Sequence, residues 1–150
     1  MPQSLARLRV HLIFSTKNRD PLLHDSIHDA LHRYIAVVLQ NLDCPATIIN
    51  SVEDHIHLLF ELSRTIAMSS AVEEIKKTSS KWMKTQGEPF SKFAWQSGYG
   101  AFAVSESNVA AVREYIANQR EHHRVKTFQE EYRVFLERHG VSYDERYVWD

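Results

Sequence analysis

The 150-residue sequence lacks the features that mark several large classes of protein. Its single cysteine, Cys44, excludes an internal disulfide and a zinc site built from several cysteines. With four glycines and four prolines, the chain has no room for a flexible linker or a low-complexity tail. The longest wholly apolar run, Tyr34 to Leu39, is far shorter than the roughly 20 residues that span a bilayer, and no apolar leader opens the chain. We therefore expect a folded, cytoplasmic protein without a membrane segment.

Charge of neither sign dominates the sequence. The formal net charge of −1 argues against a protein that coats nucleic acid through bulk electrostatics. The distribution is uneven, because five lysines and one glutamate lie between positions 75 and 92, whereas six acids and three arginines lie between 128 and 150. A local basic patch is thus available for a polyanion, although charge patterning alone identifies no partner.

The hydrophobic pattern predicts an α+β fold. Period-two alternation and turn residues predict strands over 7–15, 45–52, 54–62 and 93–104, the last one bent at its glycines. Helical spacing predicts helices over 25–41, 66–86, 105–124 and 128–138, and an irregular end. The order β-α-β-β-α-β is ferredoxin-like: two helices cover one face of a four-stranded antiparallel sheet and leave the other face open. We expect one domain over 1–150, with its core at about 6–104 and the remaining helices and tail at about 105–150.

The most specific local feature is the pair His55 and His57. Residues two apart on a strand point to the same face, so both imidazoles can reach one ion while Ile56 faces the core. Because the first and third strands are neighbours in this fold, the open face would carry Arg7, Arg9, His11, His55 and His57. Two histidines on a solvated sheet face remain the plainer interpretation. The sequence that follows the pair, Leu58-Leu59-Phe60, argues against zinc hydrolases, which often place Asp-His there.

A second feature is the pair Tyr115 and Gln119 on the helix predicted over 105–124. Side chains four residues apart lie one turn apart on the same helical face, at the edge of the packing stripe formed by Val109, Val112 and Ile116. Considered alone, Tyr115 is typical of a boundary packing residue and Gln119 of a surface residue.

Together, these motifs resemble the single-tyrosine HUH transposases of the insertion sequence 200/605 family. That family combines a His-hydrophobic-His strand, a later Tyr-x-x-x-Gln helix and a ferredoxin-like fold; this sequence supplies His55-Ile-His57 and Tyr115-Ile-Ala-Asn-Gln119. The opening Val10-His-Leu-Ile-Phe-Ser-Thr-Lys-Asn-Arg19 and the segment Trp95-Gln-Ser-Gly-Tyr-Gly100 are also similar. The resemblance covers nearly the whole chain from about Arg9, and four motifs in the same order make it specific.

The resemblance implies an enzyme that cleaves and rejoins single-stranded DNA at the ends of an insertion sequence. Tyr115 would attack phosphorus, leaving a 5′-phosphotyrosine and a free 3′-hydroxyl. The covalent bond conserves the phosphodiester energy, so no nucleotide cofactor is needed, and no phosphate-binding Gly-rich loop is visible. By the same resemblance His55, His57 and Gln119 hold Mg²⁺ or Mn²⁺, although nitrogen ligands would also accept Zn²⁺. No general base can be chosen from the sequence.

The resemblance also implies partners. These are single-stranded DNA that carries hairpins and a second copy of the chain, in a homodimer whose tyrosine helix acts in cis or in trans. It implies a prokaryotic protein associated with the nucleoid during action. The basic residues we expect to contact phosphate are Lys17, Arg19, Lys77, Lys81 and Lys84, although an ordinary solvated face explains them equally well.

Three alternatives remain open at the level of sequence. One is a domesticated relative that acts on repeated genomic palindromes with the same chemistry. Another is a non-catalytic regulator that binds hairpin DNA and needs neither histidine nor Tyr115. The third is a metal hydrolase of a small phosphodiester, whose turnover would not depend on Tyr115.

Overall fold

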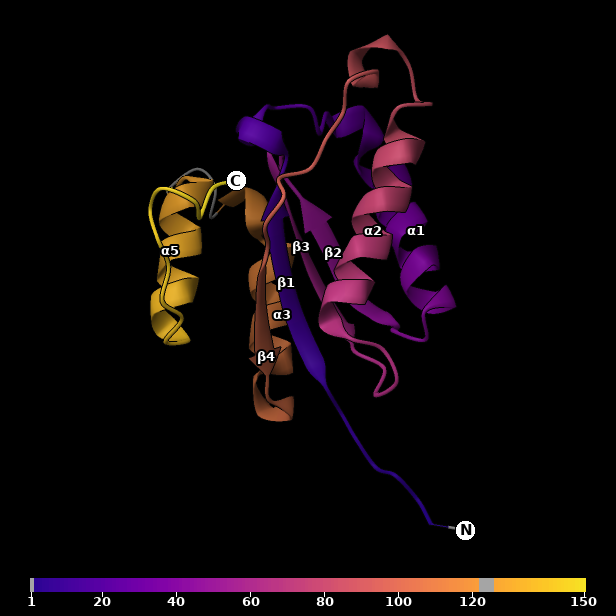
Figure 1. The fold of residues 1–150 in the computed structure, drawn as a ribbon, viewed down its shortest axis with the longest axis vertical. Helices are drawn as coiled ribbons and strands as arrows, with labels where there is room; N and C mark the ends of the chain where they lie inside the picture. The colour runs from indigo at the N-terminus through magenta and orange to yellow at the C-terminus, as the bar shows by residue number, and fades with distance from the viewer. Residues whose placement is uncertain (1, 122–125) are drawn as a thin grey trace.

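One four-stranded antiparallel sheet organises the chain, in the order β2-β3-β1-β4 (Figure 1). The computed structural model describes residues 2–121 and 126–150. The strands are β1 (Arg9–Ser15), β2 (Ala46–Ser51), β3 (His55–Glu61) and β4 (Gly100–Val104). The helices are α1 (Asp25–Asn41), α2 (Met68–Met83), α3 (Val109–Ala117) and α5 (Phe128–Arg138), with short 3₁₀ turns η1 (Lys17–Arg19), η2 (Glu88–Phe90) and η3 (Glu106–Asn108). The ferredoxin-like order predicted from the sequence is confirmed.

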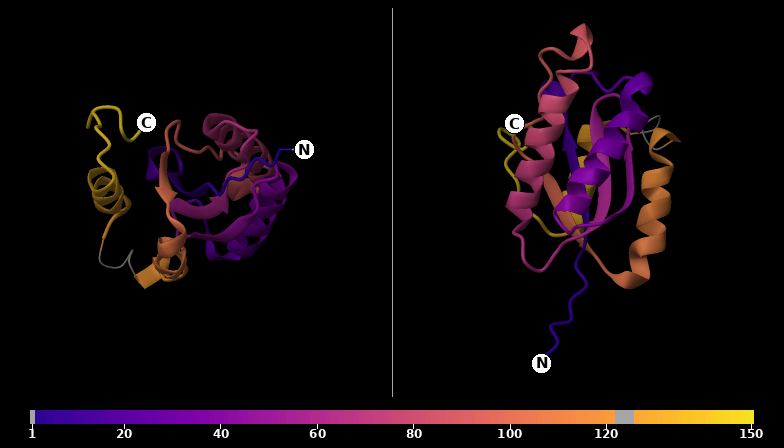
Figure 2. Two further views of the ribbon diagram at one scale, coloured as in Figure 1. Left: turned by 90° about the horizontal axis from the view of Figure 1, so that it is seen from below. Right: turned by 90° about the vertical axis from the view of Figure 1, so that its right-hand side faces the viewer.

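Helices α1 and α2 cover one face of the sheet (Figure 2). Alternation along β1 sends Leu12 and Phe14 to this side, where they pack with Ile56 and Phe60 of β3. The apolar stripes of α1 and α2 close the layer with Leu31, Ile35, Leu39, Val72 and Ile75. Each of these fully buried side chains contributes about 1.5–3 kcal/mol through removal of apolar surface from water, and together they hold β1 and β3 at the centre of the sheet.

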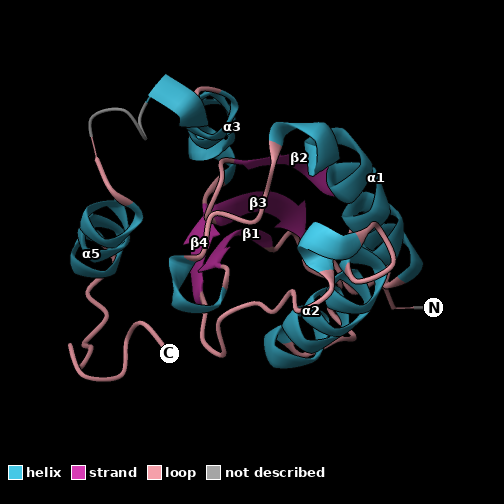
Figure 3. Cartoon of the chain, turned by 90° about the horizontal axis from the view of Figure 1, so that it is seen from above, coloured by secondary structure: helices cyan, strands magenta, loops and turns pink. Residues whose placement is uncertain are grey.

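The second face of the sheet is covered as well, so the prediction of an open face is wrong. Helices α3 and α5 lie on this side, across the sheet from α1 and α2 (Figure 3). The cluster beneath them contains Ile13 of β1, Phe102 of β4, and Phe128, Tyr132 and Phe135 of α5. As a result, side chains of β1 and β3 on this face are enclosed: His11, His55 and His57 are each at most 1% exposed.

Two predicted elements are shorter in the structure. The strand expected over 93–104 is regular only in β4; before it, the chain forms a loop that makes one bridge between Thr16 and Trp95. Trp95 is buried and packs edge-on against Phe14 and Phe93. At Gly100, a Cβ would come within 3.0 Å of the Tyr132 ring, so the glycine permits the close approach of α5 to β4.

The helix expected over 105–124 begins later and ends earlier. It opens with η3, and α3 runs only from Val109 to Ala117. Gln119 therefore follows the end of α3, and positions 122–124 of the expected helix lie outside the described residues. Among the helices that the structure describes, none combines the length and apolar composition needed to cross a membrane.

Candidate active site

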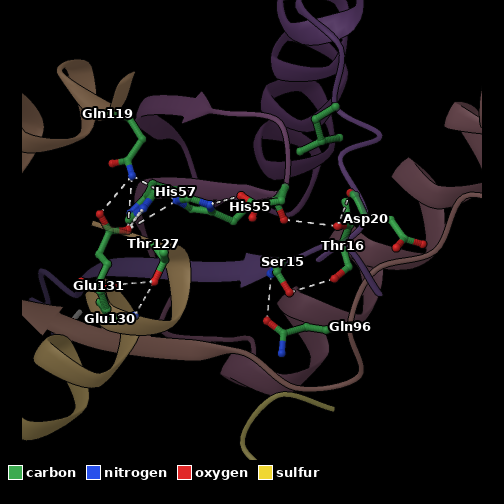
Figure 4. A network of polar contacts seen from close by, with 12 residues as sticks. Ser15, Thr16, Asp20, His55, His57, Gln96, Gln119, Thr127, Glu130 and Glu131 are labelled. Atoms are coloured by element: carbon green, nitrogen blue, oxygen red, sulfur yellow. Dashed lines mark hydrogen bonds and ion pairs between the residues drawn. The ribbon is translucent and has the colours of Figure 1, made fainter. Parts of the chain in front are cut away.

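His55 and His57 lie side by side on β3, facing the layer formed by α3 and α5 (Figure 4). Ile56 between them belongs to the opposite core, as strand alternation requires. Their ring centroids are 5.3 Å apart, and both side chains are shielded from solvent. The strand therefore presents two imidazoles from one rigid element.

A hydrogen-bond partner fixes the orientation of each imidazole. His55 Nδ1 lies 2.6 Å from Asp54 Oδ1, and His57 Nδ1 lies 2.8 Å from His11 Nε2. In the described structure both Nε2 atoms face the Glu131 carboxylate; with the proton of each ring on Nδ1, both Nε2 atoms would be free to bind a cation from the same side. Burial, and then the nearby His57, lower the pKa of His11 well below its usual value, so His11 stays neutral and can accept from His57.

Glu131 of α5 occupies the space between the two histidines, and sequence reasoning missed it. Its Oε1 lies 2.7 Å from His57 Nε2 and 3.4 Å from His55 Nε2. The carboxylate is 3% exposed and belongs to the buried face of α5, together with Phe128 and Phe135. Glu131 follows Phe128 by three residues and precedes Phe135 by four, so helical spacing puts this acid on the apolar face of the helix. That spacing is the signal in the sequence that could have revealed it.

Tyr115 and Gln119 reach the same carboxylate from the other side. The Tyr115 hydroxyl donates to Glu131 Oε2 at 2.6 Å. Gln119 Nε2 lies 3.1 Å from that oxygen and 3.1 Å from His55 Nε2. Although α3 ends between them, the chain stays helical at 119–121, and the four residues predicted as the site, Tyr115, His55, His57 and Gln119, are brought together.

Asn50 of β2 holds the end of α3 in place. Its Nδ2 donates to the carbonyl oxygens of Ile116 at 2.8 Å and of Ala117 at 3.3 Å. Asn50 is also the register partner of His57 on the adjacent strand. One amide thus links the end of the helix that carries Tyr115 to the strand that carries the histidines.

The electrostatics of the site keep Glu131 ionised and Tyr115 protonated. Burial alone would raise the pKa of Glu131, but hydrogen bonds from His55 and His57 outweigh it and hold that pKa far below its usual value. Burial and the charge of Glu131 raise the pKa of the Tyr115 phenol well above its usual value. Burial opposes protonation of His55, yet hydrogen bonds to Asp54 and Glu131 raise its pKa. The ionised Glu131 carboxylate, enclosed by buried hydrogen-bond donors, therefore forms a negative centre that suits a cation.

The same residues fit a divalent metal ion. Ligand atoms of His55, His57 and Glu131 all lie within 4.8 Å of one another, close enough to share one ion. Gln119 adds an amide, whose buried Oε1 accepts no hydrogen bond from any residue in the described ranges. Such an unsatisfied buried oxygen is costly, and a half-turn of the amide would direct it at a bound cation.

The basic residues predicted to contact phosphate divide into two groups. Lys77 and Lys81 are exposed on α2 and Lys84 directly after its end, across the sheet from the histidines. Lys17 and Arg19 form part of η1, which follows directly after β1, where Ser15 pairs with His55. The η1 pair therefore lies close to the end of the sheet where β3 begins with His55, whereas the lysines of α2 lie on the opposite face of the sheet.

The comparisons with known proteins point to one family. The family model described as "Transposase IS200 like" matches residues 4–119, a segment that includes His55, His57, Tyr115 and Gln119 but ends before Glu131. No curated protein matches the sequence significantly.

Two solved structures share the fold. One is a protein from Deinococcus radiodurans R1 assigned as a transposase, with a TM-score of 0.63 and 24% identity, which covers 79% of this chain and 98% of its own. The other is a REP-associated tyrosine transposase bound to a REP hairpin, with a TM-score of 0.60 and 16% identity over 82% of this chain and 73% of its own. Both likenesses concern the fold, whereas the family model covers more than half of the sequence. The chain belongs to the IS200-like transposase family.

Proposed function

We propose that this protein cleaves and rejoins single-stranded DNA through a covalent bond between Tyr115 and the DNA. The observation that carries the proposal is the convergence of the Tyr115 hydroxyl, two strand histidines and one carboxylate within a single buried cluster. A family of transposases supplies the reaction class, and the site supplies the residues in their roles.

Tyr115 is the proposed nucleophile. Its oxygen attacks the phosphorus atom, the bond from phosphorus to the 3′-oxygen breaks, and the 3′-oxygen takes up a proton to become a free hydroxyl. The DNA then remains joined to Tyr115 through its 5′-phosphate. The Tyr115 hydroxyl donates to Glu131 Oε2 at 2.6 Å, so the proton that Tyr115 gives up leaves along this hydrogen bond; because the pKa of Glu131 is low, the carboxylate passes the proton on and does not retain it. Rejoining reverses these steps with a 3′-hydroxyl as the attacking group.

His55, His57 and Glu131 are the proposed metal ligands, and Gln119 is a further ligand through its amide oxygen. When bound, Mg²⁺ or Mn²⁺ supplies a positive charge that stabilises the charge developing on the phosphate. His11 and Asp54 keep the two Nε2 atoms available by holding the protons on Nδ1. The carboxylate was absent from the ligand set implied by family resemblance, and it favours a hard cation with oxygen ligands.

Single-stranded DNA with hairpins is the proposed partner, and a domesticated relative acting on genomic palindromes is the second candidate. The fold match to a transposase bound to a REP hairpin supports this partner class. Lys17 and Arg19 are the proposed phosphate contacts near the site, whereas the α2 lysines would require a strand that wraps around the sheet. A homodimer remains part of the proposal.

A strand-cleavage assay tests this function. Single-stranded DNA from both flanks of the protein's own gene is incubated with the protein and Mn²⁺ or Mg²⁺. We expect a protein–DNA band that resists SDS with wild type, and no such band with Tyr115→Phe, with His57→Ala or with chelator. Hairpin binding without any covalent band would instead support a binding regulator, and metal-dependent turnover that survives Tyr115→Phe would support a phosphodiester hydrolase.

A further inference from the structure

We infer that a cavity beside Tyr115 binds one unpaired DNA base, belonging to a nucleotide next to the reacting phosphate. The inference rests on the proposed function, and it adds a binding site for the base to the site for the phosphate. The cavity measures about 340 Å³, within the range of pockets that hold small planar ligands.

The cavity lies between the edge strand β4 and the helices α3 and α5, which face the same side of the sheet (Figure 3), and His11 of β1 and Asn108 of η3 also line it. Its walls include Phe102, Ala103, Ala111, Tyr115, Phe135 and Arg138. None of these is among the proposed metal ligands. Tyr115, which meets Glu131, and His11, which orients His57, line this cavity and also belong to the proposed catalytic centre.

The aromatic rings of the cavity suit a flat ligand. The rings of Phe102 and His139 stack at 4.5 Å and 27°, and those of Phe102 and Phe135 stack at 5.7 Å and 22°. The Arg138 guanidinium lies 5.8 Å from the centre of the Phe135 ring. Stacked rings together with a planar cation are the groups with which proteins bind unpaired bases without reading a fixed sequence.

The position of the cavity connects it to the reacting phosphate. A second, smaller hollow of about 50 Å³ is lined by Tyr115, Glu131, Lys126 and Arg138. A phosphate that meets the Tyr115 hydroxyl there lies near two cations, while the base of an adjoining nucleotide is tethered within reach of the larger cavity. Since Arg138 lines both spaces, it can contact phosphate and base together.

The test fills the cavity without adding an aromatic ring. Ala111 is exposed on α3, and Val104 of β4 lies on the same face of the strand as Phe102, so Ala111→Leu with Val104→Leu adds aliphatic atoms to the cavity from both sides. Ala110→Leu is the matched control, because Ala110 is equally exposed on α3 and does not line the cavity. All proteins carry Tyr115→Phe, so that binding is measured without chemistry. The probes are short single-stranded homopolymers of each base and an abasic strand of the same length.

We expect the protein with an unfilled cavity to bind at least one base-bearing strand about tenfold or more tightly than the abasic strand. Filling the cavity should abolish that preference and leave the affinity for the abasic strand unchanged, whereas Ala110→Leu should keep the preference. Equal affinity for both kinds of strand, or a preference that survives filling, would overturn the inference. If wild type forms a covalent adduct but the protein shows no base preference, base binding in the cavity is refuted and the proposed function stands. If the protein prefers base-bearing strands but wild type forms no adduct, the proposed function is refuted and base binding stands.

Discussion

Glu131 is the residue on which the site depends most heavily, because both histidines, Tyr115 and Gln119 all contact it. Burial and then the negative charge of Glu131 raise the pKa of the Tyr115 phenol, and the same charge suits Glu131 to the proposed role of ligand for a divalent ion. A bound cation would offset that charge and favour the phenolate. In the proposed mechanism, activation of Tyr115 would thereby be coupled to binding of the cation.

Glu131→Gln tests this coupling. The amide preserves the size of the side chain but removes its charge, so we expect metal affinity to fall by about tenfold or more and covalent adduct to form more slowly. Titration calorimetry with Mn²⁺ and the SDS-resistant band provide the measurements. Glu130→Gln is the matched control, because Glu130 is exposed and bonds to Thr127. Equal metal binding and adduct formation in the two variants would contradict a role for Glu131.

His32 lies away from the candidate site, and it makes the free energy of unfolding depend on pH. Its Nε2 lies 2.7 Å from Ser51 Oγ, and burial, with a smaller effect of His28, lowers its pKa from 6.5 to about 4. Because the folded pKa lies below the unfolded one, the neutral ring stabilises the fold above pH 6.5, and this stability is lost as pH falls toward 4. The loss amounts to at most about 3 kcal/mol.

Denaturant unfolding of His32→Gln across this pH range checks the sign. The variant should show a shallower fall in unfolding free energy between pH 6.5 and 4 than wild type. His24→Gln, at an exposed position, should retain the wild-type slope. An unchanged slope in His32→Gln would show that another group controls the dependence.

At the scale of elements, the sequence predicted the helices and strands whose hydrophobic residues recur at a regular spacing. The boundaries of α1 and α5 agree with prediction, and β1, β2 and β3 agree within a few residues, because alternation and helical spacing are strong over those segments. β4 and α3 are shorter than predicted because packing decides their limits: Gly100 begins the strand where Tyr132 approaches, and α3 ends where Asn50 binds its carbonyls.

Only part of the candidate site was predictable, because the sequence pattern reveals residues that are close together in the chain. His55 and His57 are visible as a local pair, and Tyr115 and Gln119 as another, but nothing local joins the two pairs to Glu131. Helical spacing places Glu131 on the apolar face of α5 without saying what that face contacts. Glu131 becomes recognisable as a site residue only when α5 is seen to pack over β1 and β4. The same packing encloses the face of the sheet that was expected to be open.

Asn50 provides a prediction at this scale. Asn50→Ala removes both bonds to the end of α3, so we expect a loss of about 1 kcal/mol in unfolding free energy and slower adduct formation. Asn50→Asp should be worse, because a carboxylate would face two carbonyl oxygens. Chemical denaturation together with the adduct assay provides the comparison. Asn41→Ala, at the exposed end of α1, is the control, and equal behaviour of all three variants would show that α3 needs no such anchor.

For the whole molecule, one chain contains every side chain of the proposed site. β3 provides the histidines, α3 and the turn after it provide Tyr115 and Gln119, and α5 provides Glu131. In this arrangement the proposed mechanism has Tyr115 attack a phosphate held by the histidines of the same chain, whether or not the protein forms a homodimer.

Mixing inactive variants tests that arrangement. We expect a mixture of Tyr115→Phe and His57→Ala proteins to form no more adduct than either protein alone, because neither chain contains a complete site. A mixture of wild type and Tyr115→Phe controls for inhibition by the inactive chain. Recovery of adduct in the first mixture would show that the tyrosine of one chain serves the histidines of another.

Identification of the residue that carries the DNA tests the central claim most directly. The adduct from wild type is digested with protease and nuclease, and the modified peptide is sequenced by mass spectrometry. The sequence contains six tyrosines, and we predict a nucleotide on Tyr115 alone, with no modified peptide from Tyr115→Phe. A nucleotide on any other residue, or an adduct that persists in Tyr115→Phe, would contradict the assignment of Tyr115 as the nucleophile.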